Sequence, residues 1–209
     1  LNRVILQSKR ASAPAQINVP RDFWTQVIDI ELPAIVEFER PSGGDEAIAA
    51  AADMLSNAKF PVMLNGAGVV IGGAIDASIE LAERLDAPVC CGYQHNDAFP
   101  GSHPLFAGPL GYNGSKAGME LIAKADIILA LGTRLNPFST LPGYGIDYWP
   151  KNAKIIQVDI NPDRIGLTKP VTIGIVGDAK KVAASLLRRL GPKAGDAGPY
   201  PAHGLWRPA

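Results

Sequence analysis

Four glycines in the stretch "PVMLNGAGVVIGGA" (residues 61–74) are the first residues whose spacing could serve chemistry. Gly66, Gly68, Gly72 and Gly73 follow a short apolar run, as do the glycines that cradle a diphosphate in dinucleotide-binding proteins. Their spacing is G-x-G-x-x-x-G instead of G-x-G-x-x-G, and the next apolar run ends in "CCG" without an acidic residue. Two interpretations stay open: the glycines allow a tight turn, or a helix beginning near Gly72 faces a phosphate. This stretch alone favours the tight turn.

Other side chains with chemical potential lie shortly after this turn. His95, Asn96, Asp97 and His103 share one loop and could be imagined around a metal ion. Neither a helical i, i+4 spacing nor a cysteine partner accompanies them, which favours ordinary polar loop residues. Cys91 could act as a nucleophile, but a cysteine at a buried strand end is typically an inert small hydrophobe. Neither a G-x-S-x-G elbow nor a Walker A lysine occurs, so the residues alone complete no catalytic constellation.

The elements that must position these residues alternate between apolar runs and helical patterns. Strands are predicted at residues 61–64, 87–92, 126–132, 154–160 and 171–177, and a loop at residues 93–113. Apolar residues at helical spacing predict helices through Ile48, Ala51, Leu55 and Ala58, through Ile75, Ile79 and Ala82, over residues 115–125, and through Val182, Leu186 and Leu190. Asp45 and Asp178 are predicted to cap the first and last of them.

The predicted strands are apolar throughout instead of alternating, which is typical of a sheet with helices on both faces. The fold class is therefore α/β: a doubly wound, Rossmann-like parallel sheet of about six strands. The carboxyl ends of parallel strands share one edge, where ligands bind if they bind at all. The residues predicted to line a nucleotide groove at this edge are Gly66, Gly68, Gly132, Arg134, Asp159 and Asn161.

The chain divides by composition into four segments. Residues 1–22 look separate, with a partial helix followed by a strand at residues 15–19, and residues 23–41 form an extended, proline-punctuated linker. Residues 42–191 contain the sheet. Residues 192–209 are rich in Gly, Pro and Ala and are expected to form a flexible tail.

Composition excludes several classes of partner. Twenty basic and 20 acidic residues give a net charge of +0, which provides no field for nucleic acid. No apolar run approaches the roughly 20 residues that span a bilayer, and no signal-peptide pattern is present. The 2 cysteines are adjacent, so neither a disulfide framework nor a zinc site can be drawn, and a cytoplasmic location is expected. A chain that starts at Leu1 and not at Met is expected to be a fragment.

Several stretches in fixed order carry a family resemblance. "PAQINVPRD", "FPVMLNGAGV", "LAERLDAPV", "FPGSHPLFAGPLGYNGSKAGMELIAKADIILALGTRLN", "KIIQVDINP" and "VGDAKKV" resemble the central domain of thiamine-diphosphate enzymes related to acetolactate synthase. The resemblance covers residues 13–190. Within this superfamily, "GYQHNDAFPGSHP" and "GTRLNPFSTLPGYGIDYWP" are most similar to the sulfoacetaldehyde acetyltransferase branch.

The resemblance implies an organisation. Such subunits have three α/β domains, and the first and third bind thiamine diphosphate and Mg²⁺ across a dimer interface, in a homodimer or homotetramer. Residues 1–22 then look like the end of the pyrimidine-binding domain and residues 42–191 like the central domain. The family's catalytic glutamate would precede Leu1, and its Gly-Asp-Gly magnesium motif would follow residue 209. No catalytic or metal-binding residue is therefore expected in this segment, which should be inactive alone.

The resemblance also implies a reaction. Sulfoacetaldehyde and phosphate are converted to acetyl phosphate and sulfite, with the cofactor as electron sink. Both substrates are anions, and Arg134 with the turn at Gly132 provides the best candidates in this segment for lining their groove. Structural salt-bridging of Arg134 is an equally good interpretation.

Flavin-containing relatives carry an acidic pair after the fourth strand, where this chain reads "GTRLNP" (residues 132–137). Flavin adenine dinucleotide is therefore not expected, and the nucleotide groove is interpreted as vestigial. Two alternatives stay open: an acetolactate-synthase-like enzyme acting on a 2-oxo acid, and a non-catalytic nucleotide-binding module that uses Gly66, Gly68 and Asp159.

Overall fold

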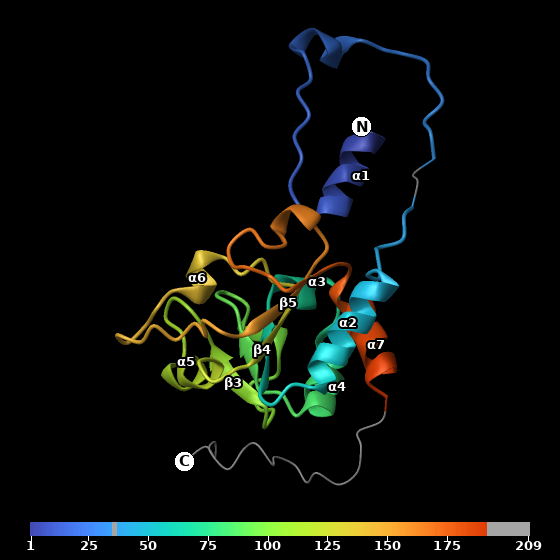
Figure 1. Cartoon of the computed structure of the whole chain (residues 1–209). Helices are drawn as coiled ribbons and strands as arrows, with labels where there is room; N and C mark the ends of the chain where they lie inside the picture. Colours follow the sequence, from blue (N-terminus) through green and yellow to red (C-terminus); the bar gives the residue numbers. More distant parts are fainter. Residues whose placement is uncertain (35–36, 192–209) are drawn as a thin grey trace. The chain divides into compact units, whose positions relative to one another are not determined.

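A computed structural model describes residues 1–34 and 37–191 (Figure 1). The predicted tail at residues 192–209 lies outside the described residues. The chain forms two compact units, Leu1–Arg40 and Pro41–Ala209. No helix in the described part of the chain is both long enough and apolar enough to span a bilayer.

The described residues of the first unit form two short helical elements. They are α1 (Asn2–Ala11), as predicted, and the 3-10 turn η1 (Arg21–Thr25). The strand predicted at residues 15–19 is wrong: these residues are exposed and form no strand among the described residues. A strand needs a neighbouring strand to satisfy its backbone groups, and the described part of this unit supplies none.

Within the described residues, the second unit is built on a sheet of six parallel strands in the order β3-β2-β1-β4-β5-β6. In chain order the strands are β1 (Pro61–Asn65), β2 (Val89–Cys91), β3 (Phe106–Pro109), β4 (Ile127–Leu131), β5 (Lys154–Asp159) and β6 (Ile173–Val176). β1 lies centrally, with Leu64 opposite both Cys90 and Ala130. The predicted doubly wound α/β fold is confirmed.

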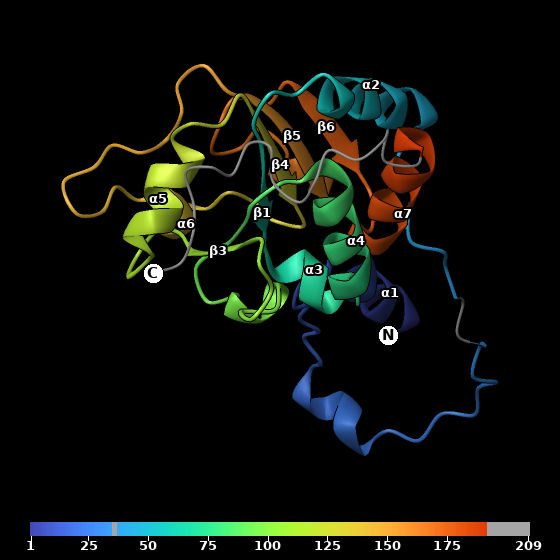
Figure 2. The ribbon, with the colours of Figure 1, turned by 90° about the horizontal axis from the view of Figure 1, so that it is seen from below.

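Helices cover both faces of this sheet, as Figure 2 shows. One face packs on α2 (Asp45–Ser56), α4 (Ile75–Leu85) and α7 (Ala179–Leu190), and the other on α5 (Lys116–Ile122). Successive residues of β1 enter different cores: Met63 joins the first and Leu64 the second. Because both faces are buried, the strands read as continuous apolar runs.

The strand β3 falls inside the segment predicted as a loop. Gly108 has φ +101° and Pro109 ends the strand, so the sequence carries turn signals where the structure has a strand. The register against β2 also shifts between Val89 and Cys90. An edge strand tolerates proline and a bulge because it has only one neighbouring strand. The apolar pattern used to predict strands therefore did not identify β3.

One predicted helix cap is confirmed and one is wrong. The Asp178 carboxylate accepts hydrogen bonds from the backbone N–H groups of Lys180 and Lys181, at 3.0 and 3.3 Å, and caps α7. Asp45 is instead the first residue of α2, and Gly44 takes the cap position without a side-chain bond. A carboxylate in the first helical turn still complements the helix dipole.

Candidate functional site

The glycine turn leads directly into a helix. The short α3 (Ala67–Ile71) begins after Gly66, and Gly72 ends it. The predicted helix is α4, which begins at Ile75, three residues after Gly72, and α3 is an additional short helix that was not predicted. The backbone N–H of Gly68 donates to the Gly132 carbonyl at 2.8 Å, and that of Gly66 donates to the Leu131 carbonyl at 3.1 Å. The turn after β1 is thus bonded to the turn after β4.

These two turns touch at their glycines. A Cβ on Gly68 would lie 2.6 Å from the Gly132 Cα, and a Cβ on Gly132 would lie 2.7 Å from the Gly68 Cα. A Cβ on Gly66 would meet the Thr133 Cβ at 2.5 Å. The space beside these glycines is filled by neighbouring chain, so packing between the two turns is sufficient to require glycine.

The other predicted groove residues lie at the carboxyl ends of β4 and β5. Asp159 is only 6% exposed as a residue, and its carboxylate accepts a hydrogen bond from the Asn161 backbone N–H at 2.9 Å. Asn161 in turn caps η3 (Pro162–Arg164), accepting from the Asp163 N–H at 3.0 Å. Arg134 is exposed. The six predicted residues thus form two groups, three glycines where β1 meets β4 and three polar residues where β4 meets β5.

Burial dominates the electrostatics of Asp159. Loss of hydration raises the pKa of this carboxyl above its ordinary 3.8, while the Asn161 backbone bond, Arg164 and, more weakly, Arg134 act to lower it. The raised pKa means that the folded protein holds this proton more tightly than the unfolded chain does.

Asp159→Asn is expected to stabilise the fold at neutral pH. The amide oxygen can still accept the Asn161 N–H, while the cost of burying a charge disappears. Because the folded-state pKa is raised, the carboxylate's stability contribution is present below the unfolded value of 3.8 and is lost as pH rises through the folded value. The gain should therefore vanish near pH ~4 in urea unfolding curves. A variant that is less stable at neutral pH would mean that the attraction of Arg164 and Arg134 outweighs burial.

A buried glutamine that no sequence motif marks connects the ends of β4 and β5. Gln157 is 1% exposed, and its side chain donates to the carbonyls of Thr133 and Arg164, both at 3.1 Å. Its Oε1 accepts from the Gly166 N–H at 2.9 Å. The sequence signal for it is a polar residue between apolar ones in "IIQV" (residues 155–158).

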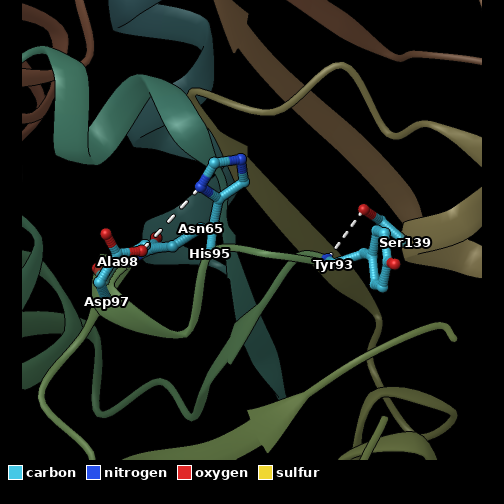
Figure 3. Close-up of polar contacts among 6 residues, drawn as sticks. All are labelled: Asn65, Tyr93, His95, Asp97, Ala98 and Ser139. Carbon is cyan, nitrogen blue, oxygen red and sulfur yellow. Dashed lines mark hydrogen bonds and ion pairs between the residues drawn. The ribbon is translucent and has the colours of Figure 1, made fainter. Parts of the chain in front are cut away.

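The loop after β2 separates the residues considered for a metal site. His95 Nδ1 lies 3.9 Å from Asp97 Oδ1, beside the 3-10 turn η2 (Asn96–Ala98) (Figure 3). His103 instead faces α4, with Nε2 3.3 Å from Glu83 Oε1. Among the described residues, no group of three or more His, Cys, Asp or Glu side chains is placed to hold a metal ion.

Three aromatic side chains from different loops meet at the carboxyl edge. Tyr93 follows β2, Tyr112 follows β3, and Phe138 lies in the short α6 (Pro137–Thr140) after β4. Tyr93 stacks on Phe138 at 5.7 Å between ring centroids and meets Tyr112 edge-on at 5.8 Å. The backbone N–H of Tyr93 donates to Ser139 Oγ at 3.1 Å, as Figure 3 shows. This cluster depends on long-range contacts, so local sequence patterns do not reveal it.

Both cysteines are unsuited to nucleophilic chemistry. Burial raises the pKa of the Cys90 thiol far above its usual range, and burial with the nearby Asp97 raises the pKa of Cys91 to about 12. Since the thiolate is the reactive form, both side chains are protonated and inert at neutral pH. For Cys91 this agrees with the interpretation as an inert small hydrophobe.

A family model described as "Thiamine pyrophosphate enzyme, central domain" matches residues 48–186. This chain belongs to the thiamine pyrophosphate enzyme family. It is 80% identical over 197 residues to sulfoacetaldehyde acetyltransferase of Roseovarius nubinhibens, covering 94% of this chain and 33% of that protein. It is 32% identical over 178 residues to the acetolactate synthase large subunit of Corynebacterium glutamicum, covering 83% of this chain and 28% of that protein.

The fold also matches solved structures. The benzoylformate decarboxylase of Polynucleobacter necessarius superposes with a TM-score of 0.68 at 22% identity, covering 83% of this chain and 32% of that one. At 22% identity this structural similarity shows a shared fold and nothing about a shared activity. The predicted resemblance to the sulfoacetaldehyde acetyltransferase branch is confirmed. The chain spans about a third of the length of the curated relatives that it matches.

The described residues do not fit a thiamine diphosphate and magnesium site. A magnesium diphosphate is held by several oxygen ligands, and no cluster of three or more metal-ligating side chains is found in the described part of the chain. In the glycine turn, the usual place for a diphosphate in this fold, the Gly68 N–H is already used by the Gly132 carbonyl.

Proposed function

We propose that this chain is the central segment of a thiamine-diphosphate-dependent sulfoacetaldehyde acetyltransferase. The whole protein would convert sulfoacetaldehyde and phosphate to acetyl phosphate and sulfite. The observation that carries the proposal is the 80% identity to a protein of that name over 94% of this chain, against 32% to an acetolactate synthase subunit.

In this proposal the segment is a scaffold. Residues 1–22 would end a preceding pyrimidine-binding domain, residues 23–41 would be a linker, and residues 42–191 would form the central domain. Thiamine diphosphate and Mg²⁺ would be bound elsewhere in a cytoplasmic homodimer or homotetramer. The segment alone would be inactive.

The proposed groove would not hold flavin adenine dinucleotide. Close packing of Gly68 on Gly132 supports this, because the Gly68 N–H, which could have bound a diphosphate, donates to the Gly132 carbonyl instead. Arg134, at the end of β4, would serve small anionic substrates instead. Gly66, Gly68, Gly132, Asp159 and Asn161 would then shape this edge of the sheet.

The test is sulfite release by a protein of the relatives' length that contains this chain, supplied with thiamine diphosphate, Mg²⁺ and phosphate. We expect sulfite and acetyl phosphate from sulfoacetaldehyde in a phosphate-dependent reaction, and no turnover of pyruvate. Turnover of pyruvate without sulfite would identify an acetolactate-synthase-like enzyme. A purified chain that carries bound nucleotide and catalyses neither reaction would identify a nucleotide-binding module.

A further inference from the structure

The aromatic cluster at the carboxyl edge leaves much of its ring surface exposed. Tyr112 is 54% exposed and Phe138 is 55% exposed, although each ring contacts Tyr93. Tyr144 lies beside them: it is 65% exposed, and its hydroxyl group donates to the Gly114 carbonyl at 2.9 Å. Single exposed apolar residues are ordinary on a protein surface, whereas adjacent exposed rings mark a surface that contacts another molecule or segment. We call Tyr112, Phe138 and Tyr144 the aromatic face.

The loops that carry these rings are fixed to one another. The Tyr112 N–H donates to the Phe138 carbonyl at 2.8 Å, and a Cβ on Gly111 would collide with the same carbonyl oxygen. The Tyr93 N–H donates to Ser139 Oγ at 3.1 Å. The rings are therefore held in place before anything packs on them, and little further ordering is needed for a contact.

The area of the aromatic face is small for an interface between separate chains. An aromatic side chain can bury roughly 150–250 Å², so the three half-exposed rings together expose about 250–450 Å². A stable interface between two proteins buries about 800 Å² on each partner. A segment of the same polypeptide needs a smaller contact, because its tether keeps it at an effective concentration of about a millimolar. The area therefore favours a segment of the same polypeptide over a second copy of this chain.

The path of the chain indicates which segment reaches this edge. Ser42 pairs with Gly177, directly after β6, so the sheet begins its chain at the carboxyl edge. After Asp178, α7 runs back towards the amino edge and ends at Leu190. Four strand spacings, about 19 Å, separate β6 from β2. Residues 1–41 can span several times this distance, so polypeptide that precedes them can reach the rings.

We propose that the aromatic face is a docking surface for an apolar part of the polypeptide that precedes Leu1 in the whole protein. This inference rests on the proposed function only in taking the chain as one segment of a longer protein. The chain covers 33% of the relative that is 80% identical to it, so most of a protein of that length lies outside these residues. Burial of the rings against apolar side chains is favourable, and aromatic side chains are the usual anchors of such contacts.

Hydroxyl-radical footprinting measures the exposure of the rings without any substitution. Tyr112 and Phe138 should be oxidised at least about fivefold more slowly in a protein of the relatives' length than in the 209-residue chain, because burial removes most of their reactive surface. Phe60 is the matched control, a partly buried phenylalanine directly before β1 at the amino edge. Its oxidation rate should stay within about twofold.

Photo-crosslinking in the longer protein identifies what covers the face. Phe138→p-benzoylphenylalanine keeps an aromatic ring and, on illumination, bonds to the segment that lies against it. A crosslink to residues that precede Leu1, in a product of one subunit's mass, supports the proposal. A crosslink to residues that follow residue 209, or a product of twice the subunit mass, overturns it. The same substitution at Lys59, an exposed residue before β1, should give no crosslink to the preceding segment.

Further outcomes separate this inference from the proposed function. Equal oxidation of Phe138 in the two proteins, together with sulfite release, would overturn the docking surface and leave the proposed function standing. Slower oxidation and a crosslink to the preceding segment, without sulfite release, would support the docking surface and overturn the proposed function. Oxidation that slows in the 209-residue chain as its concentration rises would identify a second copy as the occupant and overturn the proposal.

Discussion

Gly132→Ala is expected to lower the free energy of unfolding by about 3 kcal/mol. Gly132 has φ +60°, a left-handed conformation that costs a residue with a Cβ roughly 1–2 kcal/mol. Its new methyl group would also lie 2.7 Å from the Gly68 Cα and 2.8 Å from the Val69 nitrogen. These neighbours are backbone atoms, so no side chain can rotate away and the two turns must separate. Urea denaturation followed by circular dichroism measures the loss.

Gly73→Ala is the matched control. Gly73 also has φ +60°, but nothing lies within 4 Å of the position that its Cβ would take. The free energy of unfolding of Gly73→Ala should therefore fall only by the cost of the left-handed conformation, roughly 1–2 kcal/mol. Equal losses in the two variants would mean that the turns after β1 and β4 do not press on each other. In that case the glycines would need another explanation, such as a ligand that approaches the backbone.

The sheet could be predicted from the sequence because its physical cause is local. Burial of both faces makes β1, β4 and β5 apolar along their length, and this is visible in "PVMLN", "IILAL" and "KIIQVD". β3 could not be predicted, since "FAGP" is a strand only because β2 lies beside it. The strand predicted at residues 15–19 does not form, because its apolar pattern has no neighbouring strand to pair with among the described residues.

The position of the proposed groove residues at one edge of the sheet could be predicted, but their contacts could not. Parallel strands bring their carboxyl ends to one edge, and this located Gly132, Arg134 and Asp159 from the sequence alone. The hydrogen bonds of Gln157 join residues 7 and 24 positions away along the chain, and no local spacing reveals such contacts. The departure of the glycine spacing from G-x-G-x-x-G correctly favoured a tight turn, because these glycines lie in a turn that packs on the turn after β4.

Asn65→Asp is expected to lower the free energy of unfolding by about 3–5 kcal/mol at neutral pH. Asn65 ends β1, is 0% exposed, and donates from Nδ2 to Ser78 Oγ at 2.7 Å and to the Ala98 carbonyl at 3.0 Å. A carboxylate oxygen in place of Nδ2 would face the Ala98 carbonyl as a second acceptor. Its charge would be buried without compensation, at the point where β1 holds the loop after β2 (Figure 3).

The pH dependence separates charge from lost hydrogen bonding. Burial raises the pKa of the introduced carboxyl above the unfolded value of ~3.9, so the folded variant binds more protons than its unfolded chain. Its stability relative to the wild type should therefore fall as pH rises from ~4 towards the folded pKa. Below that range the protonated carboxyl can donate to the Ala98 carbonyl and restore part of the loss.

Asn65→Leu is the control for this experiment. It removes both donated hydrogen bonds and leaves the Ala98 carbonyl without its Asn65 donor, at a cost of about 1–3 kcal/mol, but it introduces no titrating group. The difference between its free energy of unfolding and that of the wild type should be the same at acid and neutral pH. A pH-independent loss in Asn65→Asp would show that the new carboxyl reaches water. The loop that carries Tyr93, His95 and Asp97 would then be held less firmly over the carboxyl edge than the contacts of Asn65 indicate, and that edge would be open to solvent at β1.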